Sequence, residues 1–390
     1  RTICISNCAA IDAARKEARH NHFGRCAMNI PKTMRALVAR GQGDYGLETV
    51  PVPAIGPEEI LLRVEVCGIC AGDLKATQPV ARFWGGDGMP GYCEPPFIPG
   101  HEFVGVIAAK GERATAEFSI GERVCVEQIV PCGACRYCRD GRYWLCAPHD
   151  VFGFKRSLNG GMAEYVRLPR NARLYKVPTS FTLEQAALIE PYACSLHAVR
   201  RAGIQVDDVV VLAGAGTLGL GMVGAIKLRN PRKLIALDLS EERLRLARRF
   251  GADITIQPNR EDAIRRVLDL TDGYGCDVYI EATGHPSAVP QGLEMICKGG
   301  TFVEFSVFSG PATADWSIIG DAKEIEIRGS QLSPYCFPTT IENIASGKAP
   351  TEGVVTHRFA LEDWAEAFRT AQSGAAIKVA ICPTSPMHKL

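Results

Sequence analysis

The chain has 390 residues, which is too long for one hydrophobic core of ordinary size, so we expect two domains. Hydrophobic residues make up 46%, charged residues 22%, and the formal net charge is +1, so nothing favours nucleic acid or a lipid surface as a partner. No apolar run approaches the roughly 18 residues of a membrane span. We expect a cytoplasmic globular protein.

The first 33 residues differ from the rest of the chain. They begin without methionine, and the run ICISNCAAI is too short for the apolar centre of a secretory signal. Asp12 and Glu17 are unusual in an organelle-targeting leader, which is the alternative. We expect residues 1–33 to be a disordered upstream or vector-derived extension ahead of a natural start at Met28 or Met34.

Short apolar or alternating runs follow from Met34 to about Pro178, and glycines and prolines separate them. Such runs between turn residues are typical of strands. The runs are MRALVAR, EEILLRVEVCG, EFVGVIAAKG, ERVCVE and GMAEYVRLP. This region is therefore predicted to be a mostly β domain.

Two segments of this region carry groups that bind metals. The segment VCGICAGDLK contains Cys67 and Cys70. This pair could be a redox dithiol, half of a zinc site, or two cysteines that share a turn by chance. His101 and Glu102 lie between a Pro-Gly turn and a strand, 31 residues after Cys70. Imidazole and carboxylate both bind zinc, and converging loops can bring such distant residues together. These residues alone leave the three interpretations open.

Four further cysteines lie close together in CGACRYCRDGRYWLC, namely Cys132, Cys135, Cys138 and Cys146. Neighbours at this spacing are poor disulfide partners, but one loop with four thiolates can surround a tetrahedral Zn²⁺ at about 2.3 Å per Zn–S bond. Three arginines in the loop would offset the negative charge of such a centre. We expect a structural zinc lobe at about residues 128–150, and four unrelated reduced thiols are the alternative. A site with four protein ligands has no open position for chemistry.

A different pattern begins after the helical segment SFTLEQAALIEPYACSLHAVRRAG. Apolar strands alternate with helices, as in DVVVLAGAGTLGLGMVGAIKLR and KLIALDLSEERLRLARRFG, which predicts a doubly wound parallel sheet. From about Ser330 the chain returns to mixed structure and ends in the strand IKVAIC.

A glycine-rich turn opens this second region. In VVVLAGAGTLG, Gly214, Gly216 and Gly219 follow an apolar strand and begin a helix, an arrangement that binds the pyrophosphate of a dinucleotide. Asp238 ends the next strand, 19 residues after the last glycine, where it can accept both ribose hydroxyls and repel a 2′-phosphate. This favours NAD over NADP. Arg243, the nearest cation, could lie against the adenine, and it keeps NADP from being excluded. The alternative is a purely structural turn.

The chain resembles the zinc-dependent medium-chain dehydrogenases, a family that includes alcohol, sorbitol and threonine dehydrogenases. The resemblance covers about Met34 to Pro383. It rests on the cysteine lobe, the glycine turn and the signature Gly-His-Glu-x2-Gly-x5-Gly-x2-Ala, matched by Gly100, His101, Glu102, Gly105, Gly111 and Ala114. It implies a GroES-like catalytic domain at 34–188 and 331–390, interrupted by an NAD-binding Rossmann domain at 189–330, with the active site between them.

The resemblance also implies roles for single residues and a second zinc ion, the catalytic one. Cys70, His101 and either Glu102 or Glu190 would bind this zinc, and Asp73 would orient the site. Glu190 as an ordinary acid at a helix N-terminus is the alternative. Cys67 would be a packed thiol. The cofactor site would further include Leu218, Ser306 and Val307.

The implied reaction is hydride transfer from a zinc-bound alkoxide to NAD. The chain departs from the family in the proton relay, because Gly72 stands where serine or threonine is usual and Lys75 where histidine is usual. We expect water or a neighbouring substrate hydroxyl to bridge to Lys75, which acts as a base if burial lowers its pKa. The alternative is a solvated lysine that contacts cofactor phosphate or a loop carboxylate.

The segments ARFWGGDGMPGY, EQIVPCGACRYC and HDVFGF resemble the erythritol and threitol dehydrogenase branch. This implies oxidation of a secondary hydroxyl of threitol or erythritol to erythrulose, with Phe83, Trp84 and Phe152 as pocket residues. The alternatives are a sorbitol, xylitol, L-threonine or simple secondary-alcohol dehydrogenase, and a non-enzymatic NAD-binding redox sensor. The family implies a homodimer or homotetramer, with the strand at TFVEFSVFSG as its edge.

Overall fold

The computed structural model describes residues 30–384 except 87, 89 and 309. Most of the predicted N-terminal extension, residues 1–29, lies outside this range. None of the described helices combines the length and the hydropathy of a membrane span.

One sheet is built from the N-terminal half and the C-terminal end of the chain. Six of its strands have the order β14-β15-β3-β4-β5-β7, and β6 pairs with β3. All pairs are antiparallel apart from β14 with β15. The strands are β3 (Ile60–Gly68), β4 (Glu102–Lys110), β5 (Arg123–Val126), β6 (Tyr165–Leu168), β7 (Leu174–Lys176), β14 (Val355–Ala360) and β15 (Lys378–Cys382). A separate hairpin consists of β1 (Thr33–Gly41) and β2 (Asp44–Pro51).

The pairing of β3 with β4 positions the metal-binding segments. In this antiparallel register Cys67 faces Phe103, and Gly68 faces Glu102. The segment after β3 therefore lies beside the start of β4, since antiparallel partners end and begin at the same edge of a sheet. Cys70, the residue before helix α2 (Ala71–Ala76), is thereby brought next to His101.

The second sheet is wholly parallel, with the strand order β10-β9-β8-β11-β12-β13. The chain starts at β8 in the middle of this sheet, adds β9 and β10 on one side, and then adds β11, β12 and β13 on the other side. This is the strand order of a dinucleotide-binding fold. The strands are β8 (Val209–Ala213), β9 (Lys233–Leu237), β10 (Ile254–Ile256), β11 (Cys276–Glu281), β12 (Ile296–Glu304) and β13 (Glu326–Gly329). The helices between them are α7 (Thr217–Lys227), α8 (Glu241–Arg249), α9 (Ala263–Asp269) and α10 (Ala288–Met295).

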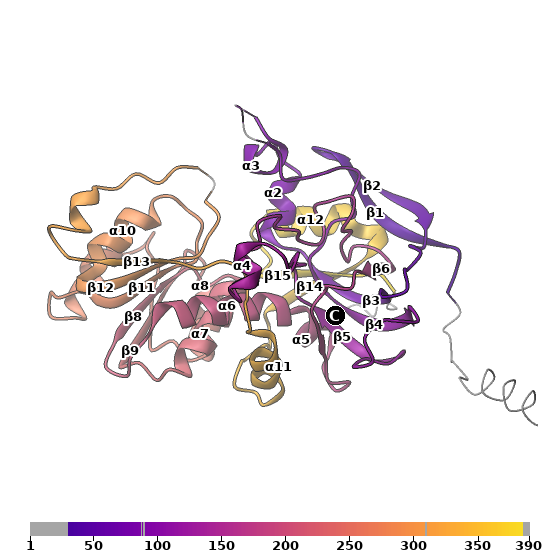
Figure 1. Cartoon of the computed structure of the whole chain (residues 1–390). Coiled ribbons are helices and arrows are strands. Elements are labelled where there is room, and N and C mark those ends of the chain that lie inside the picture. Colours follow the sequence, from indigo (N-terminus) through magenta and orange to yellow (C-terminus); the bar gives the residue numbers. More distant parts are fainter. Residues whose placement is uncertain (1–29, 87, 89, 309, 385–390) are drawn as a thin grey trace, which may run out of the picture.

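Helix α6 (Ile189–Ala202) lies between the two sheets (Figure 1). It is buried over nearly its whole length, and one buried cluster joins it to Val66 and Val104 of the first sheet and to Val210 and Ile280 of the second. The two sheets therefore share a continuous apolar core. Three other helices accompany this region: α5 (Leu183–Ala187), α11 (Phe337–Ala345) and α12 (Trp364–Gln372).

The fold differs from the sequence predictions in two respects. The predicted edge strand at TFVEFSVFSG is wrong, because β13 pairs with β12 and forms the edge of the described sheet. The segment after Cys70, which was expected to be one of two converging loops, forms helix α2. Both β13 and α2 are too short to produce a clear hydrophobic period.

Candidate active site

Three predicted ligands meet where β3 ends and β4 begins. One ligand atom each of Cys70, His101 and Glu102 lies within 4.8 Å of the other two. His101 and Glu102 are buried and Cys70 is partly buried. A thiolate, an imidazole and a carboxylate in such a group match the donor set of zinc and leave room for a further ligand.

Asp73 fixes the geometry on one side of this group. Its Oδ2 accepts a hydrogen bond of 2.9 Å from the backbone N–H of Cys70, as expected of a capping residue at the start of α2. Its Oδ1 lies 3.7 Å from Nδ1 of His101, and neither of these buried atoms has a hydrogen-bond partner in the described part of the chain. A ligating imidazole usually directs its second nitrogen toward a carboxylate. The arrangement therefore fits a metal on the opposite side of the ring.

The charges of the site depend on burial and on one another. Burial raises the pKa of the Asp73 carboxyl, against the lowering effect of His101. Burial disfavours the charged form of His101, but Asp73 and Cys70 outweigh it and the pKa of this imidazole is raised. Asp73, His101 and Cys70 thus form a largely buried cluster of ionisable groups. A bound cation would neutralise the negative charge of the carboxylate and the thiolate in such a cluster.

Glu102 has a buried partner on the last strand. Lys378 of β15 forms an ion pair with Oε2 of Glu102 and also donates to the carbonyl of Ile69 at 3.0 Å. Burial disfavours the charged form of Lys378, but Glu102, Cys70 and Glu190 together outweigh it, so the pKa of this ammonium group is raised. Lys378 was not anticipated from the sequence, since nothing in the run IKVAIC marks it as facing the site.

Glu190 lies at the N-terminal end of α6 and is 7% exposed. It is outside the group of three described above, whose ligand atoms lie within 4.8 Å of one another. Burial and the neighbouring Glu102 raise its pKa to about 7. Glu190 therefore lies beside the cluster rather than within it.

Aromatic rings form one wall of the site. Phe154 lies 5.5 Å from His101 between ring centroids and 5.8 Å from Phe83. Phe152, predicted as a pocket residue, instead packs in the core against Phe103 at 5.3 Å with no exposed surface. The prediction named the wrong ring: the two rings are separated by Gly153, whose φ of +87° lets the backbone turn between them.

Lys75 connects the cluster to the parallel sheet. It lies on α2, and its ammonium group donates to the backbone carbonyl of Val307, in the loop after β12. Burial lowers its pKa. Lys75, Ser306 and Val307 line a cavity of about 490 Å³, together with Arg82 and Glu304. The contact brings the predicted proton relay and the predicted cofactor loop to the same space.

The glycine turn has the shape that a dinucleotide requires. Gly214 has a φ of +100°, and a Cβ there would lie 2.7 Å from the carbonyl oxygen of Ala282. A Cβ on Gly219 would overlap the backbone of Gly214. At Gly216, the N-cap of α7, no described atom beyond the adjoining residues lies within 4 Å of that position. Two glycines therefore permit close packing, and the third leaves space beside the helix N-terminus for a pyrophosphate.

Asp238 and Arg243, the two charged residues predicted near this turn, are held by different hydrogen-bond partners. Asp238 accepts hydrogen bonds from the backbone N–H groups of Ala215 (2.8 Å) and Ser240 (2.9 Å), which hold its carboxylate at the end of β9. Arg243 donates through Nη2 to the carbonyls of Gly374 and Ala376, both at 3.1 Å. The guanidinium is thus anchored to the segment before β15.

The predicted cysteine lobe is compact. One sulfur each of Cys132, Cys135, Cys138 and Cys146 lies within 4.8 Å of the others. Backbone N–H groups of Ala147 and Cys138 lower the pKa of Cys135 to about 6. Four converging thiols, with backbone donors that favour thiolate, fit one tetrahedral zinc ion.

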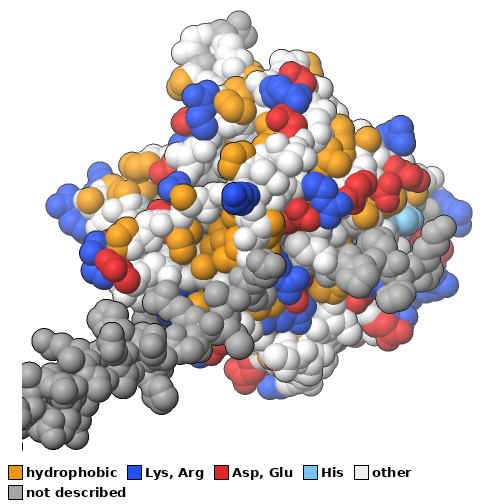
Figure 2. All heavy atoms as spheres, turned by 90° about the vertical axis from the view of Figure 1, so that its right-hand side faces the viewer, with side chains coloured by type: hydrophobic (Ala, Val, Ile, Leu, Met, Phe, Trp, Pro, Cys, Tyr) orange, Lys and Arg blue, Asp and Glu red, His pale blue; other side chains and the backbone are white. Residues whose placement is uncertain are grey.

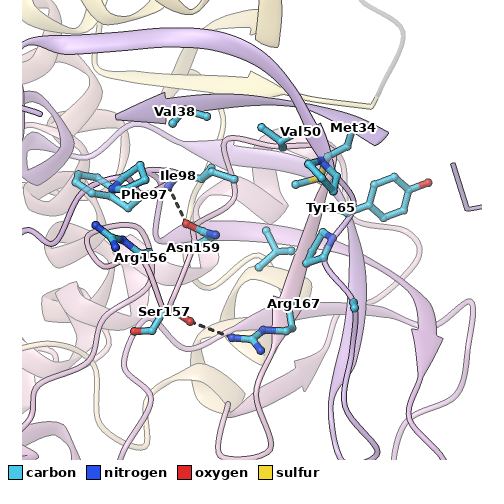
Figure 3. Close-up of a pocket in the computed structure, with 15 residues that line it drawn as sticks. Met34, Val38, Val50, Phe97, Ile98, Arg156, Ser157, Asn159, Tyr165 and Arg167 are labelled. Carbon is cyan, nitrogen blue, oxygen red and sulfur yellow. Dashed lines mark hydrogen bonds between the residues drawn. The ribbon is translucent and has the colours of Figure 1, made fainter. Parts of the chain in front are cut away.

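A second cavity, of about 390 Å³, is lined in part by residues of β1, β2 and β6. Figure 3 shows its apolar lining by Met34, Val38 and Phe97, with Arg156 and Arg167 beside them. None of the predicted site residues lines it. The surface of Figure 2 carries acidic and basic side chains interspersed around a hydrophobic area, as expected of a chain with little net charge. This cavity is separate from the candidate active site.

Family models match both parts of the chain. The model for the alcohol dehydrogenase GroES-like domain matches residues 56–179, and the model for zinc-binding dehydrogenases matches residues 217–346. The erythritol/L-threitol dehydrogenase of Mycolicibacterium smegmatis is 46% identical over 91% of this chain and 99% of its own length. The chain belongs to the zinc-dependent medium-chain dehydrogenase family. It is an oxidoreductase with zinc and a nicotinamide nucleotide as the cofactors of its family.

Other relatives of this dehydrogenase are named for different alcohols. The sorbitol dehydrogenase of Bacillus subtilis is 33% identical over 91% of this chain and 98% of its own. Among solved structures, the 2R,3R-butanediol dehydrogenase of B. subtilis has a TM-score of 0.79 at 27% identity, covering 90% of this chain and 100% of its own. A putative zinc-binding dehydrogenase of Sinorhizobium meliloti, solved with NADP, has a TM-score of 0.82 at 27% identity and the same coverage. These likenesses agree with the GroES-like and Rossmann architecture.

Proposed function

We propose that this dehydrogenase oxidises a secondary hydroxyl of a four-carbon polyol, threitol or erythritol, to a ketose with reduction of NAD. The polyol loses two electrons and two protons, NAD takes a hydride, and one proton goes to solvent. The observation that carries the proposal is the contact of Lys75 with Val307, because it joins the helix that begins at the ligand cluster to the cofactor loop. The high identity to an erythritol/L-threitol dehydrogenase supports the substrate class.

In this proposal, Cys70, His101 and Glu102 would hold a zinc ion, which would polarise the substrate hydroxyl as a Lewis acid, and a bound nicotinamide would accept the hydride. Asp73 orients the imidazole, and Lys378 holds the carboxylate of Glu102. Phe154 covers one side and excludes water there. We assign Glu102 rather than Glu190 as the third protein ligand, on the grounds of the 4.8 Å grouping.

Further residues define the cofactor. Asp238 at the end of β9 would accept the ribose hydroxyls, and Gly214, Gly216, Leu218 and Gly219 would surround the pyrophosphate. Arg243 is anchored by two backbone carbonyls and is therefore held away from the role of a 2′-phosphate partner, which supports NAD over NADP. The predicted structural zinc ion would occupy the four-cysteine lobe. The catalytic domain would comprise residues 34–188 and 331–390, and the NAD-binding domain residues 189–330.

The test is NAD reduction over erythritol, both threitols, xylitol, sorbitol, L-threonine and 2-butanol, before and after chelation. We expect the four-carbon polyols to give the highest kcat/KM, and we expect the activity to be lost on chelation and regained with Zn²⁺. Cys70→Ser, which replaces one of the three proposed zinc ligands, is the matched control for the removal of the metal by chelation. A preference of about tenfold or more for sorbitol or 2-butanol, about 1.4 kcal/mol in transition-state binding, would contradict the substrate assignment.

A further inference from the structure

A chain of buried hydrogen bonds leads from Glu190 away from the candidate active site. The thiol of Cys194 donates to Oε1 of Glu190 at 3.4 Å. The side-chain amide of Gln128 donates to the sulfur of Cys194 at 3.3 Å, and the hydroxyl of Ser333 donates to Oε1 of Gln128 at 3.0 Å. Every donor in this series points toward the carboxylate. The series therefore ends on the one group that can only accept when it is charged.

All four side chains are removed from solvent. Ser333 has no exposed surface, Gln128 is 1% exposed, and Glu190 and Cys194 are 7% and 8% exposed. Buried polar groups without partners are costly, so each member is held by the next. The series satisfies both ends of the Gln128 amide, which fixes the orientation of this side chain.

The four residues come from three separate parts of the fold. Glu190 and Cys194 are four positions apart and therefore lie on one face of α6. Gln128 follows β5, and its backbone carbonyl accepts from the N–H of Phe152 at 3.0 Å. Ser333 lies between β13 and α11, where the chain leaves the parallel sheet. The series therefore connects Glu190 to a segment next to each of the two sheets.

We infer that Cys194 and Gln128 are positioning residues that hold the Glu190 carboxyl against the candidate metal site, with Ser333 as their anchor. This inference rests on the proposed function, since it takes Glu190 as a neighbour of the catalytic metal. Cys194 acts through its S–H donor and is not itself a metal ligand. A thiol is a weak donor, so its effect is on the orientation of Glu190 rather than on folding.

The experiment compares Cys194→Val, which keeps the volume and removes the donor, with Cys194→Ser, which keeps a donor. Cys276→Val, at a fully buried thiol of the parallel sheet, is the matched control. For Cys194→Val we expect loss of metal to a chelator to be faster by about tenfold and the KM for the polyol to rise by a similar factor, the usual cost of removing an outer partner of a metal site. The KM for NAD should not change. Cys194→Ser should stay within about threefold of the wild type in both measurements.

Gln128→Leu is the second variant and should reproduce the phenotype of Cys194→Val. The inference is overturned if Cys194→Val and Gln128→Leu both behave as Cys276→Val does, if Cys194→Ser is as impaired as Cys194→Val, or if the KM for NAD rises equally. Chelator release is measured without substrate. An absence of polyol oxidation in the wild type would therefore refute the proposed function separately from this inference.

Discussion

Gly72 is the residue at which the site departs most clearly from its family, and the structure shows that a side chain would fit there. A Cβ on Gly72 would lie 3.7 Å from Phe154 Cζ, 3.8 Å from His101 Cε1 and 4.0 Å from Cys70 Sγ. These are ordinary van der Waals distances. The missing hydroxyl of the relay is therefore not explained by lack of space.

We expect Gly72→Ala to raise the free energy of unfolding by about 0.5 kcal/mol, because glycine in a helix loses more backbone entropy on folding than alanine does. The measurement is urea denaturation. Gly105→Ala is the opposite case, since a Cβ there would overlap the backbone of Arg63, and it should be destabilising. A destabilisation of 1 kcal/mol or more by Gly72→Ala would show that the position is sterically closed.

Lys75 is the second departure, and its two roles can be separated by substitution. Burial lowers its pKa, so the neutral amine becomes available as a base at a lower pH than for an ordinary lysine. We expect kcat of the wild type to rise with pH through this lowered pKa, and we expect the rise to be absent in Lys75→Met. Lys75→Arg keeps a donor for the carbonyl of Val307 but cannot lose its proton. Full activity of Lys75→Arg across pH would assign Lys75 to cofactor-loop contact alone.

At the scale of elements, the cysteine lobe is the part with the least core of its own. Its regular structure is limited to α4 (Arg136–Arg139) and the 3-10 turn Tyr143–Leu145. It is attached to the rest through Tyr143, whose hydroxyl donates to buried Glu127 at 2.8 Å, and through Tyr335, which donates to the carbonyl of Gly141 at 2.7 Å. We therefore expect so short a segment to require the proposed zinc ion for its order.

We expect Cys135→Ser to lower the zinc content by about one ion per subunit, because four-coordinate structural sites depend on every ligand. Hydrogen exchange should become faster in residues 128–150 and remain unchanged in β8–β12. Catalysis should be reduced indirectly, since the lobe supplies no group to the ligand cluster. An unchanged zinc content with unchanged exchange would refute the assignment of this metal site.

At the scale of the whole molecule, the parallel sheet ends in an exposed edge strand, and we expect a second copy of the chain to pair there. β13 is the last strand, its outer edge is unpaired in the described chain, and Ile327 on it is 46% exposed. An exposed edge strand with an apolar side chain is a template for pairing. The predicted homodimer or homotetramer would bury this edge.

We expect Ile327→Lys to shift the protein toward the monomer in analytical ultracentrifugation, because a charge would be placed in the pairing edge. Val206→Lys, at a side chain 59% exposed elsewhere on the parallel-sheet domain, is the control and should leave the assembly unchanged. If Ile327→Lys keeps the assembly state of the control, the interface lies on another surface.

The sequence by itself determined the features that depend on neighbours along the chain. The glycine turn before α7, the four-cysteine lobe and the long apolar strands were predictable, because their spacing alone constrains the backbone. Only the tertiary structure decided which distant groups meet. The β3–β4 register brings Glu102 into the cluster and leaves Glu190 beside it, β15 supplies Lys378, and Arg243 is tied to the segment before β15. Such contacts depend on strand pairing and side-chain direction between residues far apart in the sequence, and no local period records them.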